Sequence, residues 1–187
     1  MSGIAGLVLA AGGGRRYGMP KALVEYDGDL LVERAVRTAA EVCDPVVLVL
    51  GARADEVQHR ADLGEAAVVV NAEWETGMAS SLRAGLTALG ERADPIDAAV
   101  VVLVDMPGMT RAALARLAEG AGPRSLAVAR YDGVRGHPVL LGRDHWAGVV
   151  ETATGDEGAR RYLAAHDVVE VDCTGLADPT DLDVPPA

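Results

Sequence analysis

Short apolar runs, rich in Val, Leu and Ala, alternate along the chain with segments whose apolar residues have helical spacing. Most of the runs are apolar throughout, which is typical of strands buried on both faces of a sheet. The pattern predicts strands over residues 3–9, 45–50, 67–70, 98–104, 126–129, 138–141 and 168–171. It predicts helices over residues 30–42, 54–60, 79–89, 111–120 and 157–165, with Thr110 and Asp156 as N-caps of the last two.

Strands that alternate with helices indicate an α/β fold, in which a mostly parallel sheet carries helices on both faces. The chain has 187 residues, no internal repeat and no linker-like stretch, so residues 1–187 are expected to form one domain. In such sheets, ligands bind beyond the carboxyl ends of the strands. The loops after Leu9, Val70, Val104 and Leu141 are therefore the expected positions of a functional site.

Composition narrows the class of protein. Half of the residues are hydrophobic, but only 3% are aromatic and none is Phe, so the core is expected to consist of Val, Leu and Ala. The net charge of −11 argues against broad binding of nucleic acid or anionic membranes. Cys43 and Cys173 have no zinc-binding spacing, and no apolar run approaches the ~20 residues of a membrane span. Because the N-terminus also lacks the basic segment of a signal peptide, a soluble cytoplasmic protein is expected.

The loop after the first predicted strand combines consecutive glycines with cations: Gly12, Gly13, Gly14, Arg15, Arg16 and Lys21. Glycine backbone can approach a ligand closely and can turn its N–H groups inward as an anion-binding nest. Cations in the same loop favour a polyphosphate ligand. The dinucleotide fingerprint fails because Tyr17 replaces its third glycine, and the Walker A pattern fails because Met19 replaces its lysine. The alternative is a tight turn whose glycines serve backbone geometry alone.

A second polar segment, residues 71–86, follows the strand that ends at Val70. Gly77 permits a close turn, and Ser80 or Ser81 is suited to cap the helix that follows. A helix N-terminus with hydroxyls and free N–H groups fits the polar edge of a base or a ribose. The alternative is a plain capped helix over which Trp74 packs as a lid.

Asp105 follows a buried apolar strand, where an unpaired carboxylate would be costly. A divalent cation that bridges phosphates is a natural partner, because Mg²⁺ takes one or two carboxylates together with phosphate oxygens. Pro107 would stiffen the turn and fix the direction of the carboxylate. The alternative is an N-cap or turn residue.

Three further residues each have a structural alternative. His137 opens a later strand and is suited to contact a second substrate, although a lone histidine is more often structural. Asp156 is either a helix cap or a contact to the acceptor. Asp183 is either a second metal ligand or part of a solvated acidic tail. The loop after the strand at residues 138–141 offers mainly Arg143.

These motifs together resemble those of the MobA-like nucleotidyltransferases, most of all the molybdenum cofactor cytidylyltransferases (MocA type). The pattern L-A-A-G-x-[SG]-x-R-[MFY]-G-x-x-K matches residues 9–21, and N-x-x-W-x-x-G-M-x-x-S-L-x-x-G-L matches residues 71–86. D-[MQ]-P falls at residues 105–107, G-H-P-V-L at 136–140 and G-D-x-G-A-R at 155–160. D-x-D-T-P matches residues 181–185, with Val184 in place of Thr. The motifs keep the family's order and cover nearly the whole chain.

The resemblance implies a three-layer α/β/α sandwich of the nucleotide-diphospho-sugar transferase (glycosyltransferase-A) type. It also implies that an acceptor phosphate attacks the α-phosphorus of a nucleoside triphosphate and releases pyrophosphate, with Mg²⁺ as cofactor. By analogy, the glycine loop and Arg16 would hold the β- and γ-phosphates, and Lys21 the α-phosphate. The residues implied are Arg16, Lys21 and Asp105 for catalysis; Leu9, Ala10, Ala11, Gly12, Gly13, Gly14 and Ser81 for the nucleotide; His137 and Asp156 for the acceptor; and Asp105 with Asp183 for Mg²⁺.

Ala11 bears on the base, because the resemblance associates L-A-A-G with cytidylyl transfer and L-A-G-G with guanylyl transfer. CTP is therefore the expected nucleotide, and molybdopterin the expected acceptor. One alternative is a guanylyltransferase of the same fold that acts on the molybdenum cofactor or on a phospholactate. Another is a catalytically silent module that hands a pterin cofactor to a molybdoenzyme partner, although the intact Arg16, Lys21 and Asp105 argue against it. An NAD oxidoreductase is disfavoured by the missing third glycine.

Overall fold

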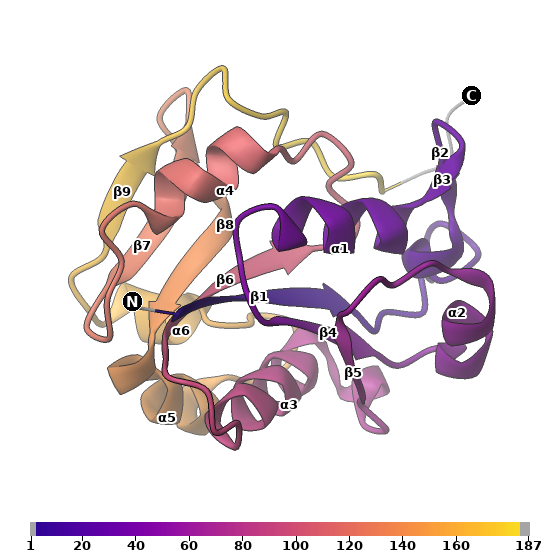
Figure 1. The fold of residues 1–187 in the computed structure, drawn as a ribbon, viewed down its shortest axis with the longest axis horizontal. Helices are drawn as coiled ribbons and strands as arrows, with labels where there is room; N and C mark the ends of the chain where they lie inside the picture. The colour runs from indigo at the N-terminus through magenta and orange to yellow at the C-terminus, as the bar shows by residue number, and fades with distance from the viewer. Residues whose placement is uncertain (1–2, 184–187) are drawn as a thin grey trace.

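A seven-stranded sheet forms the centre of the molecule in the computed structural model, which describes residues 3–183 (Figure 1). The strands are β1 (Gly3–Ala10), β4 (Val46–Leu50), β5 (Ala67–Val70), β6 (Ile96–Leu103), β7 (Leu126–Tyr131), β8 (Val134–Gly142) and β9 (Val169–Asp172). Each corresponds to one of the seven predicted apolar runs; β5 has the predicted ends, and each of the other strands is shifted at one or both ends. Val184 and Pro185 of the last sequence motif lie outside the described residues.

The strand order is β5-β4-β1-β6-β8-β7-β9. β1 pairs in parallel with β4 and β6, β4 with β5, and β7 with β9. β8 alone runs against its neighbours, because it pairs antiparallel with both β6 and β7. The prediction of a mostly parallel sheet is therefore confirmed.

The reversal of β8 corrects one expectation about the site. Because β8 is antiparallel to β6, its carboxyl end at Gly142 lies beside Ala98, near the start of β6. The loop after Leu141 is therefore at the opposite edge of the sheet from the loops after β1 and β6, and its prediction as a site loop was wrong. Arg143 serves the fold there, where its Nη1 donates to the carbonyl of Ile96 at 3.1 Å.

Helices cover both faces of the sheet, so that the molecule has three layers (Figure 1). α1 (Leu31–Ala40), α2 (Ala54–Arg60) and α4 (Arg111–Ala118) pack on one face. α3 (Met78–Gly90), α5 (Arg143–Thr152) and α6 (Arg160–Ala164) pack on the other. Each interface contains mainly Val, Leu and Ala, as the composition predicts. Within residues 3–183, no helix has the length and apolar character needed to cross a membrane.

α3 lies close to β1 because Gly85 has no side chain. A Cβ at Gly85 would come within 2.3 Å of Cδ1 of Leu7, which is fully buried. The glycine near the end of the second sequence motif therefore serves the packing of a helix on the sheet rather than the ligand.

Of the helix caps predicted at Thr110 and Asp156, one is confirmed and the other is wrong. Thr110 caps α4 as predicted, and its Oγ1 accepts a hydrogen bond from Ala113 N at 3.3 Å. Asp156 is not the cap of the helix after it, because α6 begins at Arg160 and Ala159 holds the N-cap position. α5 was not predicted. Neither was the small hairpin of β2 (Glu25–Tyr26) and β3 (Asp29–Leu30), which lies beside α1.

Candidate active site

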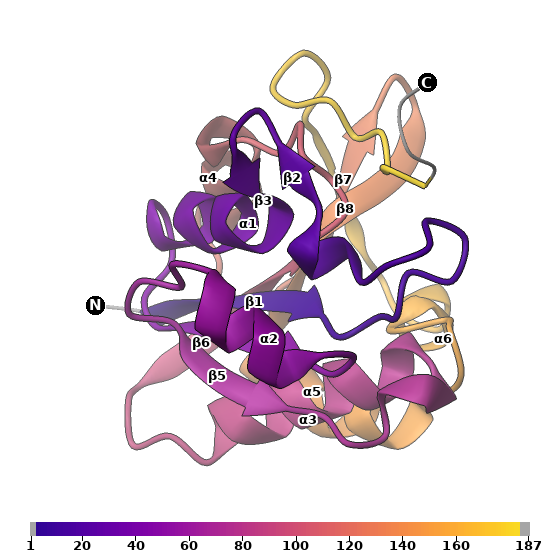
Figure 2. The ribbon, with the colours of Figure 1, turned by 90° about the vertical axis from the view of Figure 1, so that its right-hand side faces the viewer.

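A cavity of about 620 Å³ opens beyond the carboxyl ends of β1 and β6. Its volume falls in the usual range for small-molecule sites, roughly 300–1,000 Å³. Figure 2 shows this side of the molecule, where the loop after β1 and the C-terminal segment lie near each other. Among the predicted site residues, all but His137 line it: Leu9, Ala10, Ala11, Gly12, Gly13, Gly14, Arg16, Lys21, Ser81, Asp105, Asp156 and Asp183.

Two glycines of the loop after β1 have different structural roles. Gly14 has φ +62° and its carbonyl accepts from Gly18 N at 2.8 Å, while a Cβ there would lie 1.8 Å from the carbonyl oxygen of Met19. Gly14 is therefore required by the turn itself. At Gly12, by contrast, no atom of the described chain lies within 4 Å of a Cβ position. The space over Gly12 belongs to the cavity and is open to a ligand.

Trp74 packs against the glycine loop and lines the cavity. A Cβ at Gly13 would lie 2.9 Å from Cζ3 of Trp74, and one at Gly51 would lie 2.5 Å from its Cβ. Trp74 thus fixes the side of the loop that faces β4. The sequence offered Trp74 as a lid over the following helix, and its contacts with the glycine loop and the cavity were not anticipated.

Lys21 lies between two carboxylates at the cavity wall. Its Nζ donates to Oδ2 of Asp105 at 2.8 Å and to Oδ1 of Asp183 at 3.0 Å. The Lys21 side chain is 15% exposed, against 24% for Asp105 and 52% for Asp183. Arg16 Nη1 is 3.8 Å from the other oxygen of Asp183, but its side chain is 83% exposed, so this pair is weak.

The carboxylates keep Lys21 charged. Burial alone would lower the pKa of Lys21, but hydrogen bonds to Asp105 and Asp183 and their negative charges together outweigh burial and raise it. The hydrogen bond from Lys21 and its charge lower the pKa of Asp183. Burial raises the pKa of Asp181, and the charges of Asp105 and Asp183 raise it further. A third carboxyl group is therefore close to the pair.

The donor set fits a hard divalent cation. Asp105 and Asp183 present carboxylate oxygens to one point, and oxygen ligands are those that Mg²⁺ prefers. Within residues 3–183, however, no group of three or more His, Cys, Asp or Glu side chains is arranged as a complete metal site. Two carboxylates would therefore need the oxygens of a bound phosphate to complete the coordination, which is a common arrangement for Mg²⁺.

Asp183 reaches the cavity on a segment that crosses the loop after β6. This segment, residues 173–183, is called the C-terminal strap. Its backbone is held at three points: Leu176 O accepts from Thr110 Oγ1 (2.6 Å), Asp178 N donates to Gly108 O (3.2 Å) and Leu182 N donates to Asp105 O (2.8 Å). A Cβ at Gly108 would lie 2.6 Å from Cβ of Asp178, so this glycine makes room for the strap.

The start of α3 differs from the sequence prediction. Gly77 holds the N-cap position, and Ser80 and Ser81 lie inside the helix, so their prediction as caps was wrong. Asn71 Nδ2 donates to both serine Oγ atoms, at 2.8 Å to Ser80 and 3.0 Å to Ser81. Asn71 therefore ties the end of β5 to α3 and orients Ser81, which lines the cavity.

The sequence suggested free N–H groups at the start of α3, but the first two of them are paired. Met78 N donates to Oδ1 of Asp156 at 3.3 Å, and Ala79 N donates to the carbonyl of Gly155 at 2.9 Å. The loop before α6 thus supplies the cap that Ser80 and Ser81 were expected to provide. Asp156 has this structural role in addition to its place in the cavity lining.

His137 does not open β8 as predicted but lies inside it, three residues after Val134. It is close enough to Asp105 to feel its charge, but it does not line the cavity. Tyr131 Oη donates to the carbonyl of His137 at 3.0 Å. Burial lowers the pKa of His137, the charge of Asp105 opposes this, and the charge of Arg160 adds to it. His137 is therefore neutral at neutral pH, and its contact with an acceptor stays a prediction.

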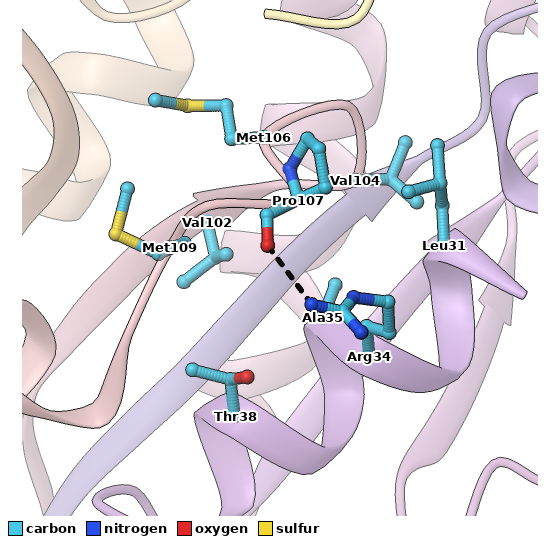
Figure 3. Close-up of a pocket in the computed structure, with 9 residues that line it drawn as sticks. All are labelled: Leu31, Arg34, Ala35, Thr38, Val102, Val104, Met106, Pro107 and Met109. Carbon is cyan, nitrogen blue, oxygen red and sulfur yellow. Dashed lines mark hydrogen bonds between the residues drawn. The ribbon is translucent and has the colours of Figure 1, made fainter. Parts of the chain in front are cut away.

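A second, much smaller cavity lies behind the turn at residues 105–107 (Figure 3). It holds about 10 Å³, which is room for about one water molecule. Arg34 of α1 borders it, and its Nη2 donates to the carbonyl of Pro107 at 3.3 Å. Within residues 3–183, the buried Nε of Arg34 has no hydrogen-bond partner. Arg34 braces the turn that carries Asp105, a role that the sequence did not suggest.

Comparison with known protein families gives a match over most of the chain. The model of the MobA-like NTP transferase domain matches residues 6–171. A protein of Paenarthrobacter nicotinovorans named nicotine blue oxidoreductase is 37% identical over 191 residues, covering 96% of this chain and 92% of that protein. The molybdenum cofactor cytidylyltransferase of Escherichia coli is 22% identical over 144 residues, covering 76% of this chain and 72% of that enzyme.

Solved structures agree with these sequence matches. The Mycobacterium tuberculosis protein Rv0371c superimposes with a TM-score of 0.85 at 30% identity, covering 98% of this chain and 93% of that one. The same protein has also been solved in complex with manganese, with a TM-score of 0.80 at 28% identity and coverage of 97% of this chain and 94% of that one. The predicted three-layer α/β/α fold is confirmed by these superpositions and by the observed layers.

Proposed function

We propose that this chain, which belongs to the MobA-like NTP transferase family, transfers a nucleoside monophosphate from CTP to a phosphorylated acceptor of the molybdopterin type. One observation carries the proposal: the glycine loop, Lys21 and two carboxylates meet in one cavity of a suitable volume. The similarity to a molybdenum cofactor cytidylyltransferase supports the choice of nucleotide and acceptor.

The reaction requires positioning and charge compensation rather than a protein nucleophile. An oxygen of the acceptor phosphate forms a bond to the α-phosphorus of CTP. The bond from that phosphorus to the bridging oxygen breaks, and pyrophosphate leaves with the electron pair. The loop at Gly12 and Arg16 would bind the leaving pyrophosphate. Lys21 would compensate the charge that develops on the α-phosphate.

Asp105 and Asp183 are the residues that would hold a divalent cation. Such an ion supplies charge compensation at the triphosphate and helps to align it. The manganese complex of the similar mycobacterial protein supports a divalent cation in this chain. Ser81 and backbone of residues 9–11 would contact the base and ribose. The carbonyls of Leu9 and Ala11 accept hydrogen bonds from Val104 N and Ala52 N, which fix the backbone at this edge of the cavity.

The proposal is tested by thermal unfolding with CTP, GTP, ATP and UTP, each with and without Mg²⁺. A ligand at a hundred times its Kd stabilises a protein by about 2.7 kcal/mol. We expect a clear rise in Tm with Mg²⁺ and CTP and a smaller one with the other nucleotides. A preference for GTP would assign the protein to guanylyl transfer. The absence of a shift with every nucleotide would contradict the proposal.

A second candidate is an oxidoreductase, because the Paenarthrobacter relative with that name is similar over nearly the whole chain. A nicotinamide cofactor would then donate hydride to an aromatic substrate. The loop after β1 argues against this function, since Tyr17 stands at the third glycine of the dinucleotide fingerprint. Oxidation of NADH or NADPH in the presence of a quinone dye, without consumption of CTP, would favour this second candidate.

A further inference from the structure

Lys21 is the single lysine of the chain; the other 16 of its 17 basic residues are arginines. Lysine carries a compact point charge with three rotatable donors, whereas arginine presents a broad planar fork. A compact cation is the kind of group that can stand between two carboxylates, as a metal ion does. Lys21 does so here, at 2.8 Å from Oδ2 of Asp105 and 3.0 Å from Oδ1 of Asp183.

The ammonium group thus takes the two oxygens that a divalent cation would need. The same ammonium is the group that the proposed function assigns to the α-phosphate. A cation that arrives alone must displace Lys21 and leave a largely buried ammonium without a partner, which is costly. A triphosphate that arrives alone must draw Lys21 away and face two unpaired carboxylates, with Asp181 close by.

We propose that Lys21 acts as an internal cation that holds Asp105 and Asp183 until a divalent cation and a triphosphate bind together. In the exchange, the metal replaces the ammonium between the carboxylates, and phosphate oxygens replace the carboxylates around the ammonium. Every charge keeps a partner when neither ligand or both ligands are bound, whereas either ligand alone leaves charges without a partner. The inference rests on the proposed function and adds to it the way in which the same site is regulated.

The C-terminal strap makes this exchange possible without large movement. The Asp183 side chain is half exposed. The backbone of the strap that carries it donates hydrogen bonds to the carbonyls of Asp105 and Gly108. Binding of metal and phosphate therefore requires new partners for the side chains but no release of the strap. The coupling is reciprocal: the factor by which the metal strengthens triphosphate binding equals the factor by which triphosphate strengthens metal binding.

The direct test measures Mn²⁺ binding without any nucleotide, from the electron paramagnetic resonance of free Mn²⁺, for the wild type and for Lys21→Met. The substitution removes the charge and keeps most of the length of the side chain. Mn²⁺ binding by Lys21→Met is expected to be at least about tenfold tighter than by the wild type, because the positive charge that pairs with both carboxylates is removed. Equal or weaker binding by Lys21→Met would overturn the inference.

Arg16→Met is the matched control, because it removes one positive charge from the same cavity. The Arg16 side chain is largely exposed, and its ion pair with Asp183 is long, at 3.8 Å. Because such exposed pairs are weak, the loss of Arg16 is expected to change Mn²⁺ affinity by less than about threefold. An equal gain in Arg16→Met and Lys21→Met would show a general charge effect and would overturn the role of Lys21.

A second measurement on the wild type covers the case in which Lys21→Met does not fold. Labelling with ¹⁵N-lysine gives a single side-chain ammonium signal, since the chain has one lysine. Mg²⁺ alone is expected to leave this signal in place, and Mg²⁺ with inorganic triphosphate to shift it. A full shift with Mg²⁺ alone would overturn the inference. Neither test uses a nucleotide or an acceptor, so both remain valid for a protein that proves not to transfer nucleotidyl groups.

Discussion

Gly12 and Gly14 are two residues apart, but they are constrained in different ways, and a pair of substitutions separates them. Gly14→Ala forces an alanine to φ +62° and places its Cβ 1.8 Å from Met19 O. The left-handed backbone alone costs about 1–2 kcal/mol. We therefore expect a lower free energy of unfolding, measured by urea denaturation.

Gly12→Ala is expected to leave stability within about 0.5 kcal/mol, because no atom of residues 3–183 lies near the added Cβ. If phosphates pack on this backbone, the same methyl group blocks them, and CTP affinity is expected to fall by at least about tenfold. Calorimetric titration with CTP measures this loss. Unchanged affinity in a folded Gly12→Ala variant would remove Gly12 from the nucleotide site.

His137 links stability to pH. Burial lowers its pKa in the folded protein below the value of about 6.5 in the unfolded chain, so the unfolded state binds the proton more readily. Protonation of His137 therefore lowers the free energy of unfolding. This loss is complete below the pKa of the folded protein and disappears as pH rises to about 6.5. We expect the free energy of unfolding to rise over this interval, and less so in His137→Gln. Identical pH profiles for the two proteins would contradict this assignment.

For single residues, the sequence grouped most of the candidate site residues around one cavity, because chemistry and spacing are local. The glycine loop, Lys21 and Asp105 each follow the end of an apolar run, which places them at one edge of the sheet. Contacts between segments far apart in the sequence could not be predicted. The cap that Asp156 provides to α3 joins residues that are 78 positions apart. Neither segment has a local pattern that indicates this contact.

At the scale of elements, α3 offers a matched pair of glycines. Gly85→Ala places a methyl group 2.3 Å from Cδ1 of the buried Leu7, and such overpacking costs about 1–3 kcal/mol. Gly90→Ala, at the end of the same helix, meets no atom of the described chain within 4 Å and is expected to gain up to about 1 kcal/mol from helix propensity. Thermal unfolding of the two variants measures both effects. Equal Tm values would show that Gly85 is not needed for helix packing.

The positions of strands were predictable from apolar runs, but their directions were not, since a run reads the same in a parallel and an antiparallel pair. A local signal for the reversal was nevertheless present. Asp132 and Gly133 both have positive φ and join β7 to β8, and Asp27 and Gly28 do the same between β2 and β3. Asp-Gly between two extended segments is a strong sign of a two-residue hairpin. This signal predicts that β7 and β8 run in opposite directions, so that only one of them can be parallel to β6.

At the scale of the whole molecule, two buried thiols report on cooperative unfolding. Cys43 lies beyond α1 and is 4% exposed, whereas Cys173 follows β9 and is fully buried. Burial raises the pKa of Cys43 to about 12, and burial also raises that of Cys173. Both thiols are therefore expected to resist labelling in the native state and to react at the same urea concentration. Earlier labelling of Cys173 would show that the β9 edge unfolds on its own.

Product analysis by mass spectrometry tests whether the protein transfers a nucleotidyl group. The protein is incubated with CTP, molybdopterin and Mg²⁺, beside an Asp105→Asn variant shown to be folded by circular dichroism. We expect pyrophosphate and a cytidylyl–pterin conjugate in equal amounts, with a rate at least about a hundredfold lower in the variant. Intact CTP with the wild-type protein, together with oxidation of NADH when an aromatic acceptor is supplied, would contradict the account.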